Sequence, residues 1–309
     1  MKGVILAAGK GTRLYPVTKV VAKPLLPIAN RMTLAYAFDQ FRACGIEDAC
    51  IVVGGNEKQV REAIGDGSEF GLRVGYVRQT EPKGLAHAVG FARDFVGNDD
   101  FVLYLGDAVY DLSLAPFVQR FQASGCANLN LVMEVDDPRR FGVASTSGER
   151  IVKLVEKPEV PESNLAMAGM YVFGPAIWRV LPGLKPSARG EFEITDAIQA
   201  LVDAGETVLA GRYEGKWFDT GTLDSFLDTT RALIGGGSLF GEGAEVNADV
   251  GENVVIGSGA NVTATRIADS VVLPGADIFV EGAVTHCLLG SRVRHEGNLD
   301  GRILYGGVE

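Results

Sequence analysis

The chain has 309 residues, enough for one large domain and a smaller one, and its 47% hydrophobic and 22% charged residues are typical of globular proteins. No apolar stretch is long enough to cross a membrane, and a formal net charge of −10 argues against general nucleic-acid binding. Because no apolar export segment opens the sequence, we expect a cytoplasmic protein that binds neither membranes nor nucleic acid.

A glycine-rich turn follows the first apolar run, residues 4–6, which predicts a buried parallel strand. Gly9 and Gly11 let the backbone turn tightly, and the N–H groups of such a turn can face an anion. A dinucleotide fingerprint does not fit, because Leu14 stands where it needs a third glycine. A Walker A loop does not fit either, because Lys10 is followed by Gly11. The pattern therefore predicts a phosphate site of another type.

Apolar runs alternate with segments of helical periodicity over the first two thirds of the chain. The expected strands are 49–53, 72–77 and 101–105, and the expected helices are 33–43, 57–64, 85–95 and 114–122. This alternation predicts an α/β fold with a mainly parallel sheet. Ligands of such sheets bind at the carboxyl ends of the strands, where the glycine turn and Asp107 both fall.

The sequence pattern changes after Ile234, where residues 235–238 form a glycine-rich linker. The fragments FGEGAEV, VGENVVI and IGSGANV place apolar or small residues at their first, fifth and seventh positions, and LPGADI repeats the pattern one residue shorter. This imperfect hexapeptide period, whose register slips around residues 265–271, favours a parallel β-helix over a generic small β domain. We expect two domains, residues 1–235 and 236–309.

Charged side chains near the expected strand ends are suited to phosphate chemistry. Arg13 and Lys23 flank the glycine turn, so a triphosphate lying there would meet two cations. Asp107 follows a strand in YLGD and Asp219 lies in WFDTGT, and each could instead cap a turn or helix. Carboxylates together with substrate phosphate oxygens are the usual ligands of Mg²⁺ in phosphoryl chemistry.

Nine motifs occur in order between residue 1 and about residue 234: GKGTRLYPVT, KPLLPI, RQTEPKGLAHAV, YLGD, RRFGVA, VEKP, SNLAMAGMYVF, LKPSARGEFEITD and WFDTGT. Together they resemble the motifs of sugar nucleotidyltransferases and, within them, of the glucose-1-phosphate thymidylyltransferases. The resemblance implies a Rossmann-like nucleotidyltransferase domain with a mainly parallel mixed sheet. The tail resembles the short left-handed β-helix that is appended to other sugar nucleotidyltransferases.

The resemblance also implies the reaction, in which a hexose 1-phosphate attacks the α-phosphorus of an NTP and pyrophosphate leaves, with Mg²⁺ as cofactor. dTTP and glucose 1-phosphate are the favoured substrates and UTP is the alternative nucleotide, because thymine and uracil differ by one methyl group. A non-catalytic sugar-nucleotide-binding regulatory subunit is a further alternative. Such a protein would usually lose the charged residues of its site.

Site residues follow from the resemblance position by position. The residues expected to bind the nucleotide are Leu6, Ala7, Gly9, Gly11, Thr12, Arg13, Gln79, Gly84 and Asp107. Those expected to bind the sugar phosphate are Gly142, Glu156, Lys157, Met167, Tyr171 and Arg189. The expected catalytic residues are Arg13, Lys23 and Lys157, and the expected metal ligands are Asp107 and Asp219. Gln79 and the Gly84 backbone would read the pyrimidine edge.

Three departures from the family pattern bear on the sugar and on the tail. Ala108 follows Asp107 where the thymidylyltransferases usually carry an asparagine that contacts sugar hydroxyls, and Met167 stands where a smaller valine is common. The hexose could therefore differ from glucose. The tail offers only His286 and His295 as bases for acetyl transfer, so we expect it to serve packing or contacts in a homo-oligomer.

Overall fold

The computed structural model describes residues 1–308, which form two compact units. Unit 1 comprises Met1–Gly9 and Tyr36–Trp217, and unit 2 comprises Lys10–Ala35 and Phe218–Glu309. The first strand and most of the glycine turn that follows it therefore fall in different units. Within residues 1–308, none of the helices combines the length and the apolar character needed to span a bilayer.

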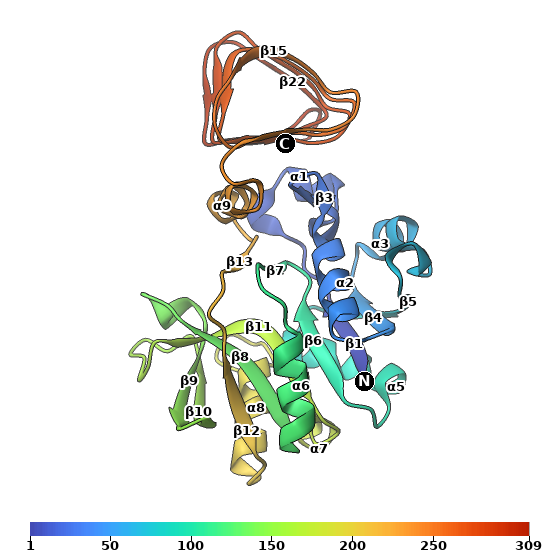
Figure 1. Cartoon of the computed structure of the whole chain (residues 1–309), viewed down its shortest axis with the longest axis vertical. Helices are drawn as coiled ribbons and strands as arrows, with labels where there is room; N and C mark the ends of the chain where they lie inside the picture. The colour runs from blue at the N-terminus through green and yellow to red at the C-terminus, as the bar shows by residue number, and fades with distance from the viewer. Residues whose placement is uncertain (309) are drawn as a thin grey trace. The chain divides into compact units, whose positions relative to one another are not determined.

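Unit 1 is built on a nine-stranded sheet with the strand order β5-β4-β1-β6-β11-β8-β12-β10-β9 (Figure 1). Its strands are β1 Lys2–Leu6, β4 Asp48–Val53, β5 Arg73–Arg78, β6 Phe101–Leu105, β8 Asn128–Glu134, β9 Gly142–Ser147, β10 Arg150–Glu156, β11 Leu165–Phe173 and β12 Val208–Arg212. The sheet is parallel from β5 to β6 and mixed beyond β6. Leu6 pairs with Val52 and Leu105, so three parallel strands end at one edge.

Helices cover both faces of this sheet, because its central strands are apolar on both sides. Val4 shares a core with Val89 of α4 and Ile198 of α8, whereas Phe41 of α2 packs edge-on against Tyr104 on the other face. The helices are α2 Thr33–Ala43, α3 Glu57–Ile64, α4 Leu85–Phe91, α5 Arg93–Val96, α6 Ala115–Ser124, α7 Ile177–Val180 and α8 Ile194–Asp203. Three of the four expected helices are confirmed as α2, α3 and α6, and the expected helix 85–95 is divided between α4 and α5.

Short connecting elements complete the two units. Those of unit 1 are η3 Ser68–Phe70, β7 Ala108–Tyr110, η4 Pro138–Arg140 and η5 Leu181–Gly183. Those before the β-helix in unit 2 are η1 Thr12–Leu14, α1 Val17–Val20, η2 Lys23–Leu25, β2 Pro27–Ile28, β3 Arg31–Met32 and α9 Leu223–Ile234, and β13 Trp217–Asp219 crosses the unit boundary. Helix α9 is capped by Gly235 in the left-handed conformation, three residues before the first strand of the β-helix.

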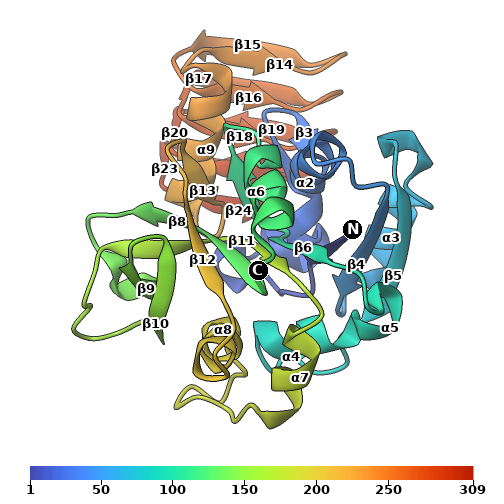
Figure 2. The ribbon, with the colours of Figure 1, turned by 60° about the horizontal axis from the view of Figure 1, so that its bottom comes forward.

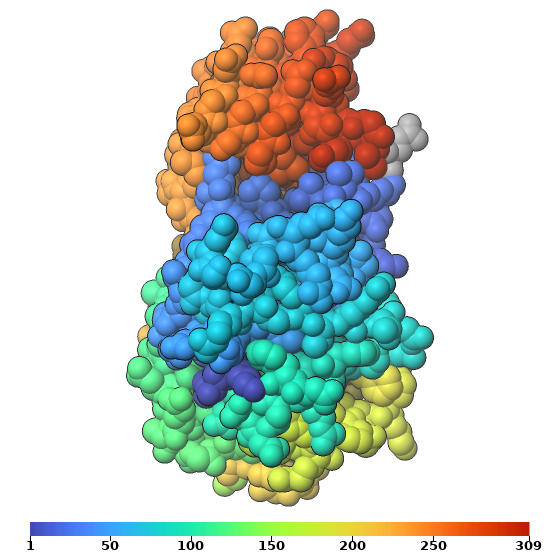
Figure 3. Space-filling view, turned by 90° about the vertical axis from the view of Figure 1, so that its right-hand side faces the viewer, coloured from blue at the N-terminus to red at the C-terminus, as the bar shows by residue number. Residues whose placement is uncertain are grey.

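The carboxyl-terminal strands form a short left-handed parallel β-helix, as expected (Figures 1 and 2). They are β14 Ser238–Phe240, β15 Glu245–Val250, β16 Val254–Ile256, β17 Asn261–Ala268, β18 Ser270–Val272, β19 Asp277–Val280, β20 Ala283–Thr285, β21 Leu288–Gly290, β22 Arg292–His295, β23 Leu299–Asp300 and β24 Ile303–Tyr305. Figure 2 shows β14, β16 and β18 stacked along one face, and Figure 3 shows the coils closely packed in orange and red.

The slip in the hexapeptide period has a structural cause. Ser238 pairs with Val254 and Val254 with Ser270, whereas Val271 pairs with Leu288, so this third coil is one residue longer than the two before it. The register between β15 and β17 also shifts by one residue, because β17 contains a bulge. A bulge inserts one residue without ending the strand, and it falls where the sequence pattern loses its register.

A column of polar residues joins α9 to the β-helix within unit 2. Asn253, Asp269 and His286 have φ values of 53°, 43° and 53°. Asn253 and Asp269 directly precede β16 and β18, and His286 lies two residues before β21 on the same β-helix face. His286 Nδ1 lies 2.6 Å from Asp269 Oδ2, and His286 Nε2 lies 2.7 Å from Asp224 Oδ1 on α9. Arg231 of α9 also bonds Asp269 over 2.6 Å. His286, one of the two histidines of the tail, therefore has a structural role in this column.

Candidate active site

The two residues expected to read the pyrimidine lie together between β5 and α4. Gln79 is nearly buried, and its amide Nε2 lies 3.3 Å from Gly84 O. Gly84 has φ 103° and ψ 174°, a conformation that only glycine adopts readily. A Cβ at Gly84 would lie 2.5 Å from the backbone O and 2.8 Å from the backbone N of Phe192. No larger residue fits there unless the chain moves at Phe192.

Residues 187–195, which we call the brace segment, fasten this turn through main-chain bonds. Phe192 N donates to Lys83 O over 2.8 Å, and Ala86 N donates to Phe192 O over 3.0 Å. The two bonds enclose Gly84, which explains why its backbone approaches Phe192 so closely. The brace segment thus fixes the loop that carries the expected base-reading groups.

The same brace segment orders Glu156 at the end of β10, on the expected sugar-phosphate side. Arg189 Nη1 lies 3.4 Å from Glu156 Oε1, and Thr195 Oγ1 donates to Glu156 Oε2 over 3.1 Å. Arg189 also pairs with Glu193 over 3.5 Å, and burial raises the pKa of the Glu193 carboxyl. Gly142 lies opposite Glu156 in the sheet, and a Cβ there would collide with Thr195. Gly142, Glu156 and Arg189 are therefore brought together, and Thr195 is a partner that the sequence did not reveal.

Lys157 occupies a strained turn directly after β10. Its φ is 45°, a left-handed conformation that costs a lysine roughly 1–3 kcal/mol. Lys157 N donates to Phe141 O over 2.9 Å, which holds the turn, and Lys157 Nζ lies 3.6 Å from Glu156 Oε1. The strained backbone thus places an ammonium group beside the carboxylate of the expected sugar-phosphate site.

Met167 and Tyr171 lie on β11, a strand in which every residue is buried. The pairing between β11 and β8 changes register between Met167 and Tyr171, so the strand bulges between them. A Cβ at Gly142 would lie 3.2 Å from Met167 Cγ, so the Met167 side chain lies beside Gly142. Burial, with a smaller contribution from Glu156, raises the pKa of the Tyr171 hydroxyl. Tyr171 therefore stays neutral at ordinary pH.

The carboxyl end of β1 brings Leu6 and Ala7 close to Asp107. Gly106 N donates to Leu6 O over 3.0 Å, and a Cβ at Gly106 would lie 2.9 Å from that oxygen, so Asp107 follows a close approach of two strands. Asn56 Nδ2 donates to Ala7 O over 2.8 Å and so fixes the backbone directly after β1. Asn56 was not expected, because it lies 49 residues along the chain from Ala7.

The rest of the glycine turn lies in unit 2 and is fixed by its own contacts. Gly11 has φ 64°, and a Cβ there would lie 3.1 Å from Lys23 Cβ and 3.1 Å from Thr18 Cγ2. Thr18 Oγ1 donates to Gly11 O over 2.7 Å, and Thr12 begins the short helix η1. Gly11, Thr12 and Lys23 are therefore neighbours. Gly9, the last residue of the first segment of unit 1, has open space where a Cβ would lie.

Arg13 and Asp219 converge over Gly221 within unit 2. A Cβ at Gly221 would collide with the Arg13 guanidinium and would lie 2.9 Å from Asp219 Oδ1. The glycine in the sequence WFDTGT is thus needed for the close approach of a cation and a carboxylate, both of them expected site residues. The sequence alone did not indicate that these two groups adjoin.

The two expected metal ligands, Asp107 and Asp219, both carry a carboxylate, a type of donor that suits Mg²⁺. Asp107 follows β6 and Asp219 ends β13, and carboxylate oxygens are hard donors of the kind Mg²⁺ prefers. From residue 1 to residue 308, the chain holds no group of three or more His, Cys, Asp or Glu side chains that could bind a metal. Mg²⁺ needs no such group where one or two carboxylates and substrate phosphates supply its ligands.

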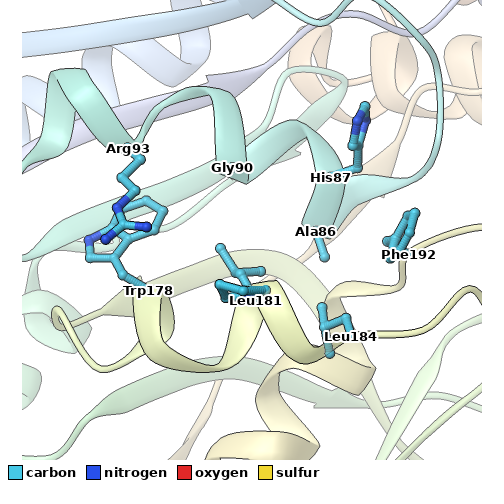
Figure 4. Close-up of a pocket in the computed structure, with 9 residues that line it drawn as sticks. Ala86, His87, Gly90, Arg93, Trp178, Leu181, Leu184 and Phe192 are labelled. Carbon is cyan, nitrogen blue, oxygen red and sulfur yellow. The ribbon is translucent and has the colours of Figure 1, made fainter.

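An apolar cavity of about 260 Å³ lies between α4, α7 and η5 in unit 1 (Figure 4). Figure 4 shows Arg93 and Trp178 at one end of the cavity and His87 and Phe192 at the other. None of the expected site residues lines this cavity. His87 connects it to the base-reading loop, because His87 Nδ1 lies 3.1 Å from Gln79 Nε2.

Comparison with known proteins gives consistent matches. The family model described as nucleotidyl transferase matches residues 2–235. The glucose-1-phosphate thymidylyltransferase of Streptomyces griseus is 39% identical over 98% of this chain and 92% of its own. The UTP–glucose-1-phosphate uridylyltransferase AglF of Haloferax volcanii is 40% identical over 72% of this chain and 91% of its own. A solved structure from Bacillus anthracis, assigned as a glucose-1-phosphate thymidylyltransferase and complexed with sucrose, is similar with a TM-score of 0.70 at 39% identity, covering 75% of this chain and 94% of that one.

Proposed function

The chain belongs to the nucleotidyl transferase family and is a sugar-1-phosphate nucleotidyltransferase, and we propose that it makes dTDP-glucose and pyrophosphate from dTTP and glucose 1-phosphate. The relative from Streptomyces griseus, which matches 98% of the chain, supports this pair of substrates. The observation that carries the proposal is the brace segment. It fastens the Gly84 turn through Phe192 and orders Glu156 through Arg189 and Thr195, so one segment serves both expected substrates.

The proposed reaction is an in-line attack of a sugar phosphate oxygen on the α-phosphorus of the nucleotide. The P–O bond to the α-phosphorus forms as the bond to pyrophosphate breaks, and negative charge moves onto the pyrophosphate. Alignment and charge neutralisation therefore supply most of the catalysis. We assign Arg13 and Lys23 to the triphosphate charge and Lys157 to the sugar phosphate. The lysine pairs with Glu156 and can exchange this partner for the substrate.

Members of this family generally depend on a divalent metal ion. We propose Mg²⁺, with Asp107 and Asp219 as its protein ligands. When bound, the ion would neutralise phosphate charge and orient the α-phosphate for attack. The backbone N–H groups of the glycine turn at Gly9, Gly11 and Thr12 would hold the remaining phosphate oxygens.

The nucleotide is proposed to be dTTP, and UTP is the alternative. The uridylyltransferase of Haloferax volcanii supports UTP at a similar identity but over a smaller part of this chain. Gln79 and the backbone of Gly84 would read a pyrimidine edge that thymine and uracil share. Leu6 and Ala7, at the end of β1, would contact the nucleotide as well.

The sugar is proposed to be glucose, held by Gly142, Glu156, Lys157, Tyr171 and Arg189, with Met167 beside them. Ala108 is buried, and its carbonyl accepts a hydrogen bond from the Tyr104 hydroxyl over 2.8 Å. A side chain that is only a methyl group cannot replace the sugar contact of an asparagine. We therefore expect weaker discrimination among hexose 1-phosphates than an asparagine would give.

The proposed organisation is a catalytic domain of residues 1–235 and a β-helix domain of residues 236–309, in a cytoplasmic homo-oligomer. The family match to residues 2–235 supports this boundary. The alternative to an enzyme is a non-catalytic regulatory subunit that only binds sugar nucleotides. The presence of Arg13, Lys23, Asp107, Lys157 and Asp219 together argues against that alternative.

Pyrophosphate release measured with dTTP, UTP, GTP and ATP, each with several hexose 1-phosphates and Mg²⁺, tests the proposal. We expect dTTP with glucose 1-phosphate to give the highest kcat/KM, and UTP to be the next best nucleotide. Tight nucleotide binding without turnover for any pair would refute the enzyme and favour the regulatory subunit. Turnover with a purine nucleotide alone would refute the assignment of the base.

A further inference from the structure

The side-chain amide nitrogen of Gln79 lies within hydrogen-bond distance of two other groups of the protein. Nε2 lies 3.3 Å from Gly84 O and 3.1 Å from His87 Nδ1. A carbonyl oxygen can only accept, so the group that faces Gly84 O must be the amide NH₂. The second hydrogen of that NH₂ then meets His87 Nδ1, which must be the unprotonated nitrogen of the ring. Both hydrogens of the amide are thereby used inside the loop.

The amide oxygen of Gln79 is left for a ligand. Within residues 1–308, Gln79 Oε1 takes part in no hydrogen bond, although only 9% of the residue is exposed. The backbone holds the side chain in place, because Gln79 N donates to Val53 O over 2.9 Å at the end of β4. Gln79 Oε1 is not one of the buried side-chain atoms that lack a partner, so this acceptor is accessible to a ligand that donates a hydrogen bond.

His87 is itself held in position by two aromatic rings. The Phe91 ring lies edge-on to it at 5.0 Å and 86°, and the Phe192 ring lies nearly parallel at 6.1 Å and 24°. Figure 4 shows His87 of α4 and Phe192 of the brace segment at the same end of the apolar cavity. The main chain of Phe192 is fixed by its bonds to Lys83 and Ala86. The imidazole therefore has little freedom to turn away from Gln79.

We propose that His87 is a specificity-determining positioning residue, which orients the Gln79 amide so that its oxygen selects bases with a hydrogen on N3. The inference rests on the proposed function, because it takes Gln79 as the reader of the base. Thymine and uracil carry that hydrogen and donate it to Gln79 Oε1. Cytosine has a lone pair at N3, which would face the amide oxygen, so the site rejects cytosine nucleotides. Without His87 the amide can rotate by 180° and present its NH₂ to the base instead.

The test compares dUTP with dCTP, which differ only at N3 and at the 4-substituent of the base. We expect the ratio of their kcat/KM values to fall about tenfold or more in His87→Ala, mainly through a higher KM for dUTP and with little change in kcat. His87→Gln should recover part of the ratio, because its amide oxygen can accept from Gln79 Nε2. Gly90→Ala on the same helix is the matched control, because a Cβ there meets nothing within 4 Å.

A purely structural role for His87 would lower activity with both nucleotides together and leave their ratio unchanged. That result, or an unchanged ratio at full activity, overturns the inference. Calorimetric titration of the same variants with dUTP and dCTP measures the preference without turnover. An inactive wild-type protein that still prefers dUTP, with the preference lost in His87→Ala, would refute the proposed reaction and support the role of His87. Equal binding of both nucleotides to the wild-type protein would refute the role of His87.

Discussion

The substitution Gly84→Ala tests whether the turn that we assign to base recognition is set by the brace segment. The methyl group would lie 2.5 Å and 2.8 Å from the backbone O and N of Phe192, and main-chain atoms fixed by hydrogen bonds cannot move aside cheaply. A non-glycine residue in this backbone region costs roughly 1–3 kcal/mol, and losing one hydrogen bond to Phe192 costs about 1 kcal/mol more. If the bound loop must bear this cost, the variant loses at least about 2 kcal/mol of transition-state stabilisation. This corresponds to a fall of roughly 30-fold in kcat/KM for dTTP.

The assay is steady-state pyrophosphate release with dTTP varied at saturating glucose 1-phosphate, together with thermal unfolding of each variant. Gly90→Ala is the control, because this glycine lies inside α4 and a Cβ there meets nothing within 4 Å. Removing a helix-interior glycine should stabilise the protein by about 0.5–1 kcal/mol and leave kcat/KM unchanged. Wild-type kcat/KM in Gly84→Ala would refute the reasoning, because it would mean that the turn relaxes without cost to nucleotide binding.

Three further changes test other parts of the site and of the β-helix. Arg13→Ala should lower kcat about 10²–10³-fold at an unchanged melting temperature, and a normal rate would remove Arg13 from the reaction. Thr195→Val removes the donor to Glu156 Oε2, so the KM for glucose 1-phosphate should rise about tenfold while the KM for dTTP stays constant; a rise in both would contradict a role on the sugar side alone. Burial opposes the charged form of His286, but hydrogen bonds to its two aspartate partners outweigh burial and raise its pKa. The stability gained from His286 is therefore complete below its unfolded pKa of about 6.5 and is lost as the pH rises through the higher folded pKa. The difference in unfolding free energy between the wild-type protein and His286→Asn should shrink from pH 6 to pH 9, and a constant difference in urea unfolding would contradict this.

Local sequence signals predicted much of the fold, because they depend on neighbouring residues. The apolar period predicted the bounds of α2 and α3 correctly. The expected helix 85–95 was interrupted instead, because the chain turns at Ala92, whose N–H donates to Val89 O over 2.9 Å. A break of this kind carries no glycine or proline signal at Ala92 itself, so periodicity alone could not place it.

Long-range contacts in the candidate site were beyond the sequence. Asn56 bonds Ala7 across 49 residues, and Thr195 bonds Glu156 across 39, so neither spacing has a recognisable pattern. The resemblance led us to expect Gly84 at the base but gave no reason for a glycine there. That reason is the Phe192 backbone, which approaches from another part of the chain.

The fate of the α-phosphate tests the central claim most directly. dTTP labelled with ³²P at the α-position is incubated with glucose 1-phosphate and Mg²⁺, and the products are separated. We predict that the label enters dTDP-glucose in equal amounts with the unlabelled pyrophosphate released. Label recovered in dTMP, or pyrophosphate released without a labelled nucleotide sugar, would contradict nucleotidyl transfer to a sugar phosphate.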